Sequence, residues 1–121
     1  HRKNPVIHCD ATKYDFSELP SVVDYLQVDC EPPATTYEIL TSIPFDKCDF
    51  KVITYEHDHY TDISSKYRAL SRVFLKSKGY KLVVSNIAPD DVNCYEDWYV
   101  HPKYINDFIL TSFSVNDNFF E

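Results

Sequence analysis

The chain has 121 residues, of which 44% are hydrophobic and 26% charged, a balance that fits one globular domain and excludes a disordered or fibrous chain. A formal net charge of −7, with no run of lysines or arginines, argues against nucleic acid as a partner, because a phosphate backbone would repel the chain. Gly79 is the only glycine, so neither a phosphate-binding loop nor a dinucleotide fingerprint can be completed within this sequence.

Neither membrane insertion nor secretion is indicated. No apolar run approaches the roughly 20 residues that cross a bilayer, and no signal-peptide pattern is present. The four cysteines lie far apart, without a C-x-x-C pair. We therefore expect a cytoplasmic protein with reduced thiols and no membrane partner.

The first part of the chain predicts two strands and a helix. Two apolar runs, residues 6–9 and 22–28, predict strands that end in Asp10 and Asp29. Two consecutive prolines then favour a helix start, and apolar residues at helical spacing continue it over residues 33–43.

The clearest helix is predicted over residues 63–76. Its apolar side chains recur every three or four residues and predict a face against the core: Ile63, Tyr67, Leu70 and Phe74. Its basic residues are predicted to face water: Lys66, Arg68, Arg72 and Lys76. Thr61 or Asp62 is placed to cap the N-terminus, and Gly79 lies just beyond the C-terminus.

Three more strands complete the predicted fold. Residues 50–55 form a strand that ends in Glu56. Residues 80–84 and 96–100 are joined by a polar loop too short for a helix, so these strands should pair antiparallel. The prediction is an α/β fold whose sheet is parallel except for an antiparallel strand pair at one edge. Residues 103–121 show no clean period and are left unassigned.

An acid follows three of the predicted strands: Asp10, Asp29 and Glu56. Ligands bind beyond the carboxyl ends of parallel strands, so three acids on one rim favour a site there. The alternative is that acids are common wherever a chain leaves a buried strand for water.

Four segments then resemble, in order and spacing, the FkbM-type S-adenosylmethionine-dependent methyltransferases. Residues 24–32 are similar to the family's apolar strand that runs into D-x-E, and residues 51–58 to its next strand, which ends in E-H. Residues 74–82 resemble the family's helix that ends in G-Y, and residues 96–102 its closing strand. Pro32 stands where the family usually has glycine.

The resemblance implies one partial domain over residues 1–121, the C-terminal half of a Rossmann-like methyltransferase sheet. Family members begin with a strand and glycine-rich loop that approach the cofactor, and a second strand ends in an acid for its ribose. Neither is found in this sequence, so we expect the chain alone to bind S-adenosylmethionine weakly or not at all and to be inactive alone. Of the cofactor-binding half, the resemblance leaves only Asp10, beside Ala11, as an acceptor for the adenine amino group.

Four residues are the catalytic candidates that the resemblance implies. Asp29 and Glu31 would orient a small-molecule acceptor, a metabolite or sugar hydroxyl, or take its proton, and Glu56 and His57 are second candidates. Each has an ordinary structural alternative: Glu31 pairs with a lysine on a helix face, or His57 bonds a backbone carbonyl. An aromatic run that comprises Tyr95, Trp98 and Tyr99 would line an acceptor pocket or simply pack at the sheet edge.

Two alternative functions remain, and self-association is also expected. The single glycine favours a non-catalytic α/β binding or assembly module. His57 and His59 point the same way in an extended backbone, so a metal-dependent hydrolase is a third reading, although H-x-H alone is a weak signal. The strand over residues 23–28 would leave one edge unpaired, so we also expect a homodimer.

Overall fold

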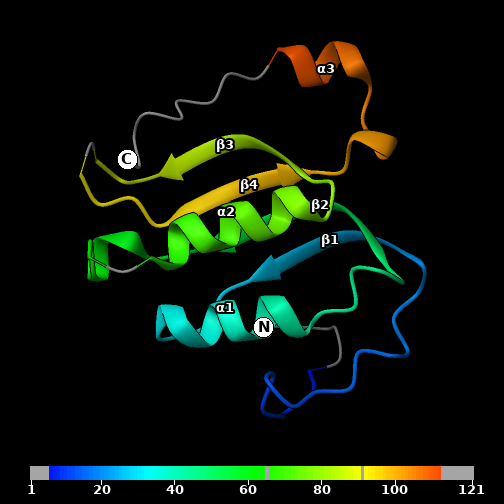
Figure 1. Cartoon of the computed structure of the whole chain (residues 1–121), viewed down its shortest axis with the longest axis horizontal. Coiled ribbons are helices and arrows are strands. Elements are labelled where there is room, and N and C mark those ends of the chain that lie inside the picture. Colours follow the sequence, from blue (N-terminus) through cyan, green and yellow to red (C-terminus); the bar gives the residue numbers. More distant parts are fainter. Residues whose placement is uncertain (1–5, 65, 91, 113–121) are drawn as a thin grey trace.

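The computed structural model describes residues 6–64, 66–90 and 92–112 of the chain. These residues form an α/β fold with a mixed four-stranded sheet in the order β1-β2-β4-β3 (Figure 1). The first two strands run parallel, and the last strand lies antiparallel between the second and the third. The strands are β1 (Val22–Val28), β2 (Asp49–Glu56), β3 (Lys81–Ile87) and β4 (Glu96–Val100).

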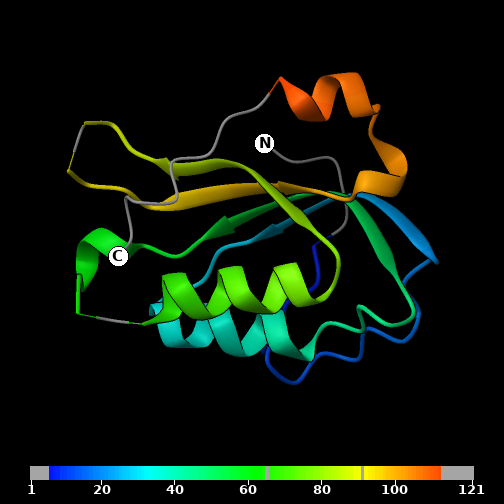
Figure 2. The same cartoon turned by 45° about the horizontal axis from the view of Figure 1, so that its top comes forward.

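Helices cover the two faces of the sheet unequally. α1 (Pro33–Ser42) and α2 (Tyr67–Ser77) lie side by side against one face, and α3 (Asp107–Thr111) lies against the other (Figure 2). Two short 3-10 turns, η1 (His59–Thr61) and η2 (Pro102–Tyr104), follow β2 and β4. No helix in the described part of the chain has the length and apolar character needed to span a membrane.

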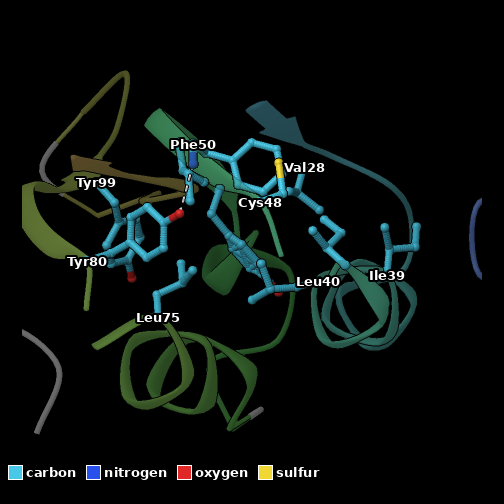
Figure 3. Packing of buried hydrophobic residues seen from close by; sticks show 11 residues of the cluster. Val28, Ile39, Leu40, Cys48, Phe50, Leu75, Tyr80 and Tyr99 are labelled. Carbon is cyan, nitrogen blue, oxygen red and sulfur yellow. Dashed lines mark hydrogen bonds between the residues drawn. The ribbon is translucent and has the colours of Figure 1, made fainter. Parts of the chain in front are cut away.

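The main core lies between the sheet and the pair α1 and α2 (Figure 3). Phe50 and Tyr99 from the sheet meet Leu40 of α1 and Leu75 of α2, and each is at most 1% exposed. The hydroxyl of Tyr80 accepts a hydrogen bond of 2.9 Å from the backbone N–H of Phe50, so this buried ring also satisfies a polar group of the sheet. Burial of these large side chains is the main favourable term for the two-layer arrangement.

α2 ends where the sequence predicts. Gly79 has a φ of +93°, in the left-handed region that side chains disfavour, and follows the last turn of the helix. The backbone N–H of Tyr80 donates to the carbonyl of Leu75 at 3.0 Å, which closes the helix in the manner of a glycine C-cap.

A buried carboxylate joins β4, α2 and β3. Asp97 of β4 is fully buried, and its Oδ2 accepts from Nε of Arg72 on α2 at 2.7 Å. Its Oδ1 accepts from Nη2 of Arg72 at 2.7 Å and from the backbone N–H of Asn86 on β3 at 2.9 Å. The side chain of Asn86 in turn accepts from both Arg72 and Arg68. Because the arginine binds the carboxylate through two donors, the pair is held in a single geometry.

This network contradicts one prediction for α2. Arg68 and Arg72 were expected to face water, but Arg68 is 6% exposed and the Arg72 side chain 10%. Sequence periodicity places both arginines on the polar side of the helix. It does not reveal that this side packs against a buried acceptor on the sheet, the Asp97 carboxylate. Long cationic side chains are buried only where such a partner neutralises them.

The start of α2 is also later than predicted. The helix begins at Tyr67, Ile63 lies outside it and is 77% exposed, and neither Thr61 nor Asp62 is its N-cap. Instead, the Asp62 carboxylate accepts from the backbone N–H of Ser64 at 3.0 Å, a local turn that competes with helix.

The predicted strand at residues 6–9 is wrong. These residues form no strand, and Val6 and Ile7 are 73% and 64% exposed. A four-residue apolar run becomes a strand only when it finds a ladder partner, and this run pairs with no described strand. The remaining strand predictions, including the antiparallel pair, are confirmed.

Replacing Arg72 by Met should leave Asp97 buried without its main counter-charge and lower the free energy of unfolding by about 3–5 kcal/mol. Urea denaturation followed by circular dichroism measures the change. Lys76→Met, one turn along α2 at an exposed position, is the matched control and should change stability by about 0.5 kcal/mol or less. Equal effects of the two substitutions would contradict the assigned role of Arg72.

Candidate functional site

An open cleft with a volume of about 640 Å³ lies at the carboxyl ends of β1 and β2. One wall consists of four acidic residues that come from these strand ends: Asp29, Glu31, Glu56 and Asp58. The remaining lining residues, the second wall, come from η1 and from the loop between β3 and β4: Tyr60, Pro89, Asn93 and Tyr95. The position agrees with the expectation that ligands bind beyond the carboxyl ends of parallel strands.

The register of the parallel pair brings the acids together. Val28 lies opposite Tyr55, so Asp29 and Glu56 leave the sheet side by side. The turn after β1 is fixed by the buried hydroxyl of Thr36, which donates to the carbonyl of Cys30 at 2.7 Å and accepts from its N–H at 3.2 Å. The acids of this turn are therefore carried on a segment whose backbone polar groups are satisfied by α1.

Three of the acids are crowded. One carboxylate oxygen from each of Asp29, Glu56 and Asp58 can lie within 4.8 Å of the other two. Burial raises the pKa of Glu56 to about 8, and a hydrogen bond with Asp29 and the charges of its acidic neighbours add to the effect. Burial and then the charge of Asp29 also raise the pKa of Asp58. Glu56 is therefore largely protonated at neutral pH and can donate a hydrogen bond, whereas its neighbours accept.

Backbone hydrogen bonds join the segment after β2 to the residues just before β4. The N–H of Asp58 donates to the carbonyl of Tyr95 at 3.1 Å, and the N–H of Tyr60 donates to the carbonyl of Cys94 at 3.2 Å. Asp58 itself has a φ of +46°, so the chain reverses direction directly after β2 and brings Tyr60 toward the cleft. These bonds anchor Asp58 and Tyr60 to the sheet beside the start of β4.

His57 does not face the cleft. Its side chain is fully buried, its Nδ1 accepts from the backbone N–H of His59 at 3.1 Å, and its Nε2 lies 3.3 Å from Oδ1 of Asp97 without a well-aligned hydrogen bond. With both ring nitrogens directed into the protein, His57 has no free face for a metal ion or an acceptor. Among the described residues, one group of potential metal ligands lies close together, and it consists of Asp29, Glu56 and Asp58. It contains neither His57 nor His59.

The cofactor candidates lie elsewhere. Asp10 is exposed in the segment before β1, and its carboxylate accepts from the backbone N–H of Thr12 at 3.0 Å and from its hydroxyl at 2.6 Å. These bonds lower the pKa of Asp10. Ala11 packs against the main core. Neither residue lines the cleft, so of the three acids expected on one rim the structure brings together Asp29 and Glu56.

Four cleft residues were not singled out from the sequence as site residues: Asp58, Tyr60, Pro89 and Asn93. Asp58 was considered only as the spacer between two histidines, yet it is the residue that reaches the cleft while His57 is buried. A strand that ends in E-H-D alternates its side chains, and this alternation was a usable signal for placing Glu56 and Asp58 on one side. Of the predicted aromatic run, Tyr95 lines the cleft and Tyr99 belongs to the core.

Comparisons of the chain with protein-family models, with curated proteins and with solved structures found no match.

Replacing Glu56 by Gln should remove part of the pH dependence of folding. The pKa of Glu56 in the folded chain, about 8, lies above the value of 4.5 for the unperturbed group, so the folded state binds this proton more tightly. As the pH rises from 4.5 toward 8, the wild-type chain therefore loses stability from this group, whereas Gln cannot titrate. Because Glu56 is partly solvent-exposed, the expected gain of the variant at high pH is about 1 kcal/mol or less.

Urea denaturation at pH 5 and pH 8.5 tests this expectation, with Glu38→Gln at an exposed position of α1 as the control. A wild-type chain and an E56Q variant with parallel pH profiles would show that Glu56 titrates normally.

Proposed function

We propose that this chain forms the acceptor-binding side of an S-adenosylmethionine-dependent methyltransferase of the FkbM type, acting on a hydroxyl of a small metabolite or sugar. One observation carries the proposal. The two acids of the D-x-E segment, Asp29 and Glu31, line the same cleft as Glu56 from the end of the next strand. The resemblance implies that the acceptor is held at these two strand ends.

The finer assignment of the fold belongs to the same proposal. A parallel pair, β1 and β2, is followed by strands that complete the sheet in antiparallel fashion. This sequence of pairings agrees with the C-terminal half of a Rossmann-like methyltransferase sheet, in which the closing strands form an antiparallel pair at one edge. α1 connects the parallel neighbours β1 and β2, and α2 connects β2 to β3, which lies one strand further along the sheet beyond β4. Both helices cover the same face, as right-handed crossovers that advance in one direction along a sheet require.

The described residues alone do not fit the whole cofactor. Gly79, the single glycine of the chain, ends α2 and does not line the cleft, and the Asp10 carboxylate is already bonded within its own turn. The proposal therefore assigns this chain the acceptor and not the grip on S-adenosylmethionine. The absence of a glycine-rich loop equally favours the second candidate, a non-catalytic α/β binding or assembly module.

The cleft residues have separable tasks toward a hydroxyl acceptor. Asp29 and Glu31 are the carboxylates available to accept its proton, since Glu56 is largely protonated at neutral pH and His57 is turned toward Asp97. The protonated Glu56 instead shares its proton with Asp29 and helps to hold that carboxylate in one orientation toward the acceptor. Correct orientation of the acceptor is a large part of what methyl transfer requires.

Asp29→Asn and Glu31→Gln should reduce turnover far more than cofactor affinity, because both acids act on the acceptor in the transition state. The measurement is transfer of a labelled methyl group to a mixture of hydroxylated metabolites by the protein that carries this sequence, expressed in wild-type form and with each substitution. We expect kcat to fall on the order of 100-fold with the Kd for S-adenosylmethionine within about twofold of wild type.

Asp46→Asn, an exposed acid remote from the cleft, is the matched control. The isolated 121-residue chain should bind S-adenosylmethionine weakly or not at all, and no methyl transfer by the natural protein would favour the binding module.

We further propose that the isolated chain is a homodimer joined through β1. This strand lies at one end of the sheet order, so one row of its backbone groups has no partner in the described sheet. Tyr25 on the same strand is 52% exposed, which adds apolar surface at that edge.

Light scattering should give twice the chain mass of 14.2 kDa, and Tyr25→Lys should shift the mass toward the monomer because lysine protects an open edge. Val73→Lys, on the exposed side of α2, is the control and should leave the dimer intact. A wild-type mass of 14.2 kDa in dilute solution would contradict the dimer.

A further inference from the structure

The charge of the cleft selects against most common metabolites. Four carboxyl groups line it, and no described lysine, arginine or histidine does. Three of these groups approach within 4.8 Å of one another, close enough for repulsion to matter. A phosphate or carboxylate ligand would add to this repulsion, whereas a positively charged group would relieve it.

The aromatic residues of the lining give an independent indication of the same kind. Tyr60 is 49% exposed, and Tyr95 reaches the cleft from the residue before β4. The faces of aromatic rings carry negative potential and attract organic cations, most strongly where solvent is partly excluded. A bare metal ion would use the acids and leave the rings without a role, while a neutral polyol would use the rings and leave the acids uncompensated. An organic ammonium group uses both walls.

We propose that the cleft binds a hydroxylated small molecule that carries a protonated amine, such as an amino sugar or an amino alcohol. This rests on the proposed function, in that the hydroxyl group of the same molecule is the methyl acceptor. The ammonium group lies between the acids at the strand ends and the ring of Tyr60, and the hydroxyl groups bond to the remaining carboxyl oxygens. The cleft volume of about 640 Å³ accommodates a molecule of this size.

Three probes of matched size separate charge from shape. Glucamine, sorbitol and gluconate are six-carbon polyols that carry a charge of about +1, 0 and −1 at neutral pH, by the ordinary ionisation of an amine and a carboxylic acid. Each is titrated into the 15N-labelled chain at low salt, and amide shifts are followed. We expect glucamine to shift the amides of Glu56, Asp58 and Tyr95 and to bind about tenfold more tightly than sorbitol, with no binding of gluconate.

Variants assign the effect to the two walls. Asp29→Asn should weaken glucamine binding at least about threefold, and Asp46→Asn, which removes the same charge far from the cleft, should not. Tyr60→Leu keeps an apolar side chain but removes the ring face, and should also weaken glucamine binding relative to wild type. Circular dichroism of each variant establishes that it is folded.

Several outcomes would overturn the proposal. Sorbitol binding as tightly as glucamine would indicate a neutral polyol site, and gluconate binding would exclude charge selection. Magnesium chloride that binds alone at these residues, together with an unchanged affinity of Tyr60→Leu for glucamine, would indicate a hard cation site. No probe involves S-adenosylmethionine, so the failure of charge selection leaves methyl transfer standing, and the absence of methyl transfer leaves charge selection measurable.

Discussion

The carboxylate of Asp97 is the constraint on which the arrangement of the other elements depends. It is fully buried on β4, and it binds Arg72 of α2 and the backbone of Asn86 on β3. Burial by itself would raise the pKa of this acid, but His57 and Arg72 outweigh that effect and hold it at about 2. A charge that cannot be neutralised by a proton near neutrality must keep its partners, so α2 is held at one position and angle on the sheet.

The same carboxylate shapes the cleft without lying in it. Because His57 turns inward to Asp97, the neighbouring residues Glu56 and Asp58 are turned to the opposite side, where they form part of the acidic wall. Backbone bonds from Asp58 and Tyr60 to the residues just before β4 fix the other end of this segment. The acids are therefore held close together, and burial of Glu56, its hydrogen bond with Asp29 and the charges of its neighbours together raise its pKa to about 8.

The sequence predicted those features that depend on residues nearby in the chain. It did not predict those that depend on a contact with a residue far away in the chain. Three local signals place elements correctly: the apolar run at 22–28, the two prolines at the start of α1, and Gly79 after α2. Each of them depends only on residues nearby in the sequence. Arg72 depends on an acid 25 residues away, so its pattern looked like that of a solvated helix face.

The same distinction holds for the site. Asp29 and Glu56 were predictable because the ends of two parallel strands share a rim. The position of Tyr60 was not, since it depends on the turn that the positive φ of Asp58 makes after β2. The strand predicted at residues 6–9 was wrong for the opposite reason. Its local apolar pattern is typical of a strand, but no described strand pairs with it.

The two walls of the cleft differ in how freely they can diverge. The acids follow or end strands β1 and β2, whose register is fixed by core residues. An insertion within either strand would therefore change the pairing of every residue beyond it. Pro89 and Asn93 belong to an exposed loop that is organised by its own short-range bonds, in which the Asp90 carboxylate accepts from the N–H groups of Val92 and Asn93. Such a loop tolerates changes of length and composition at little cost to folding. Related chains can therefore acquire new ligand preferences by altering one side of the cleft while the other side is inherited unchanged.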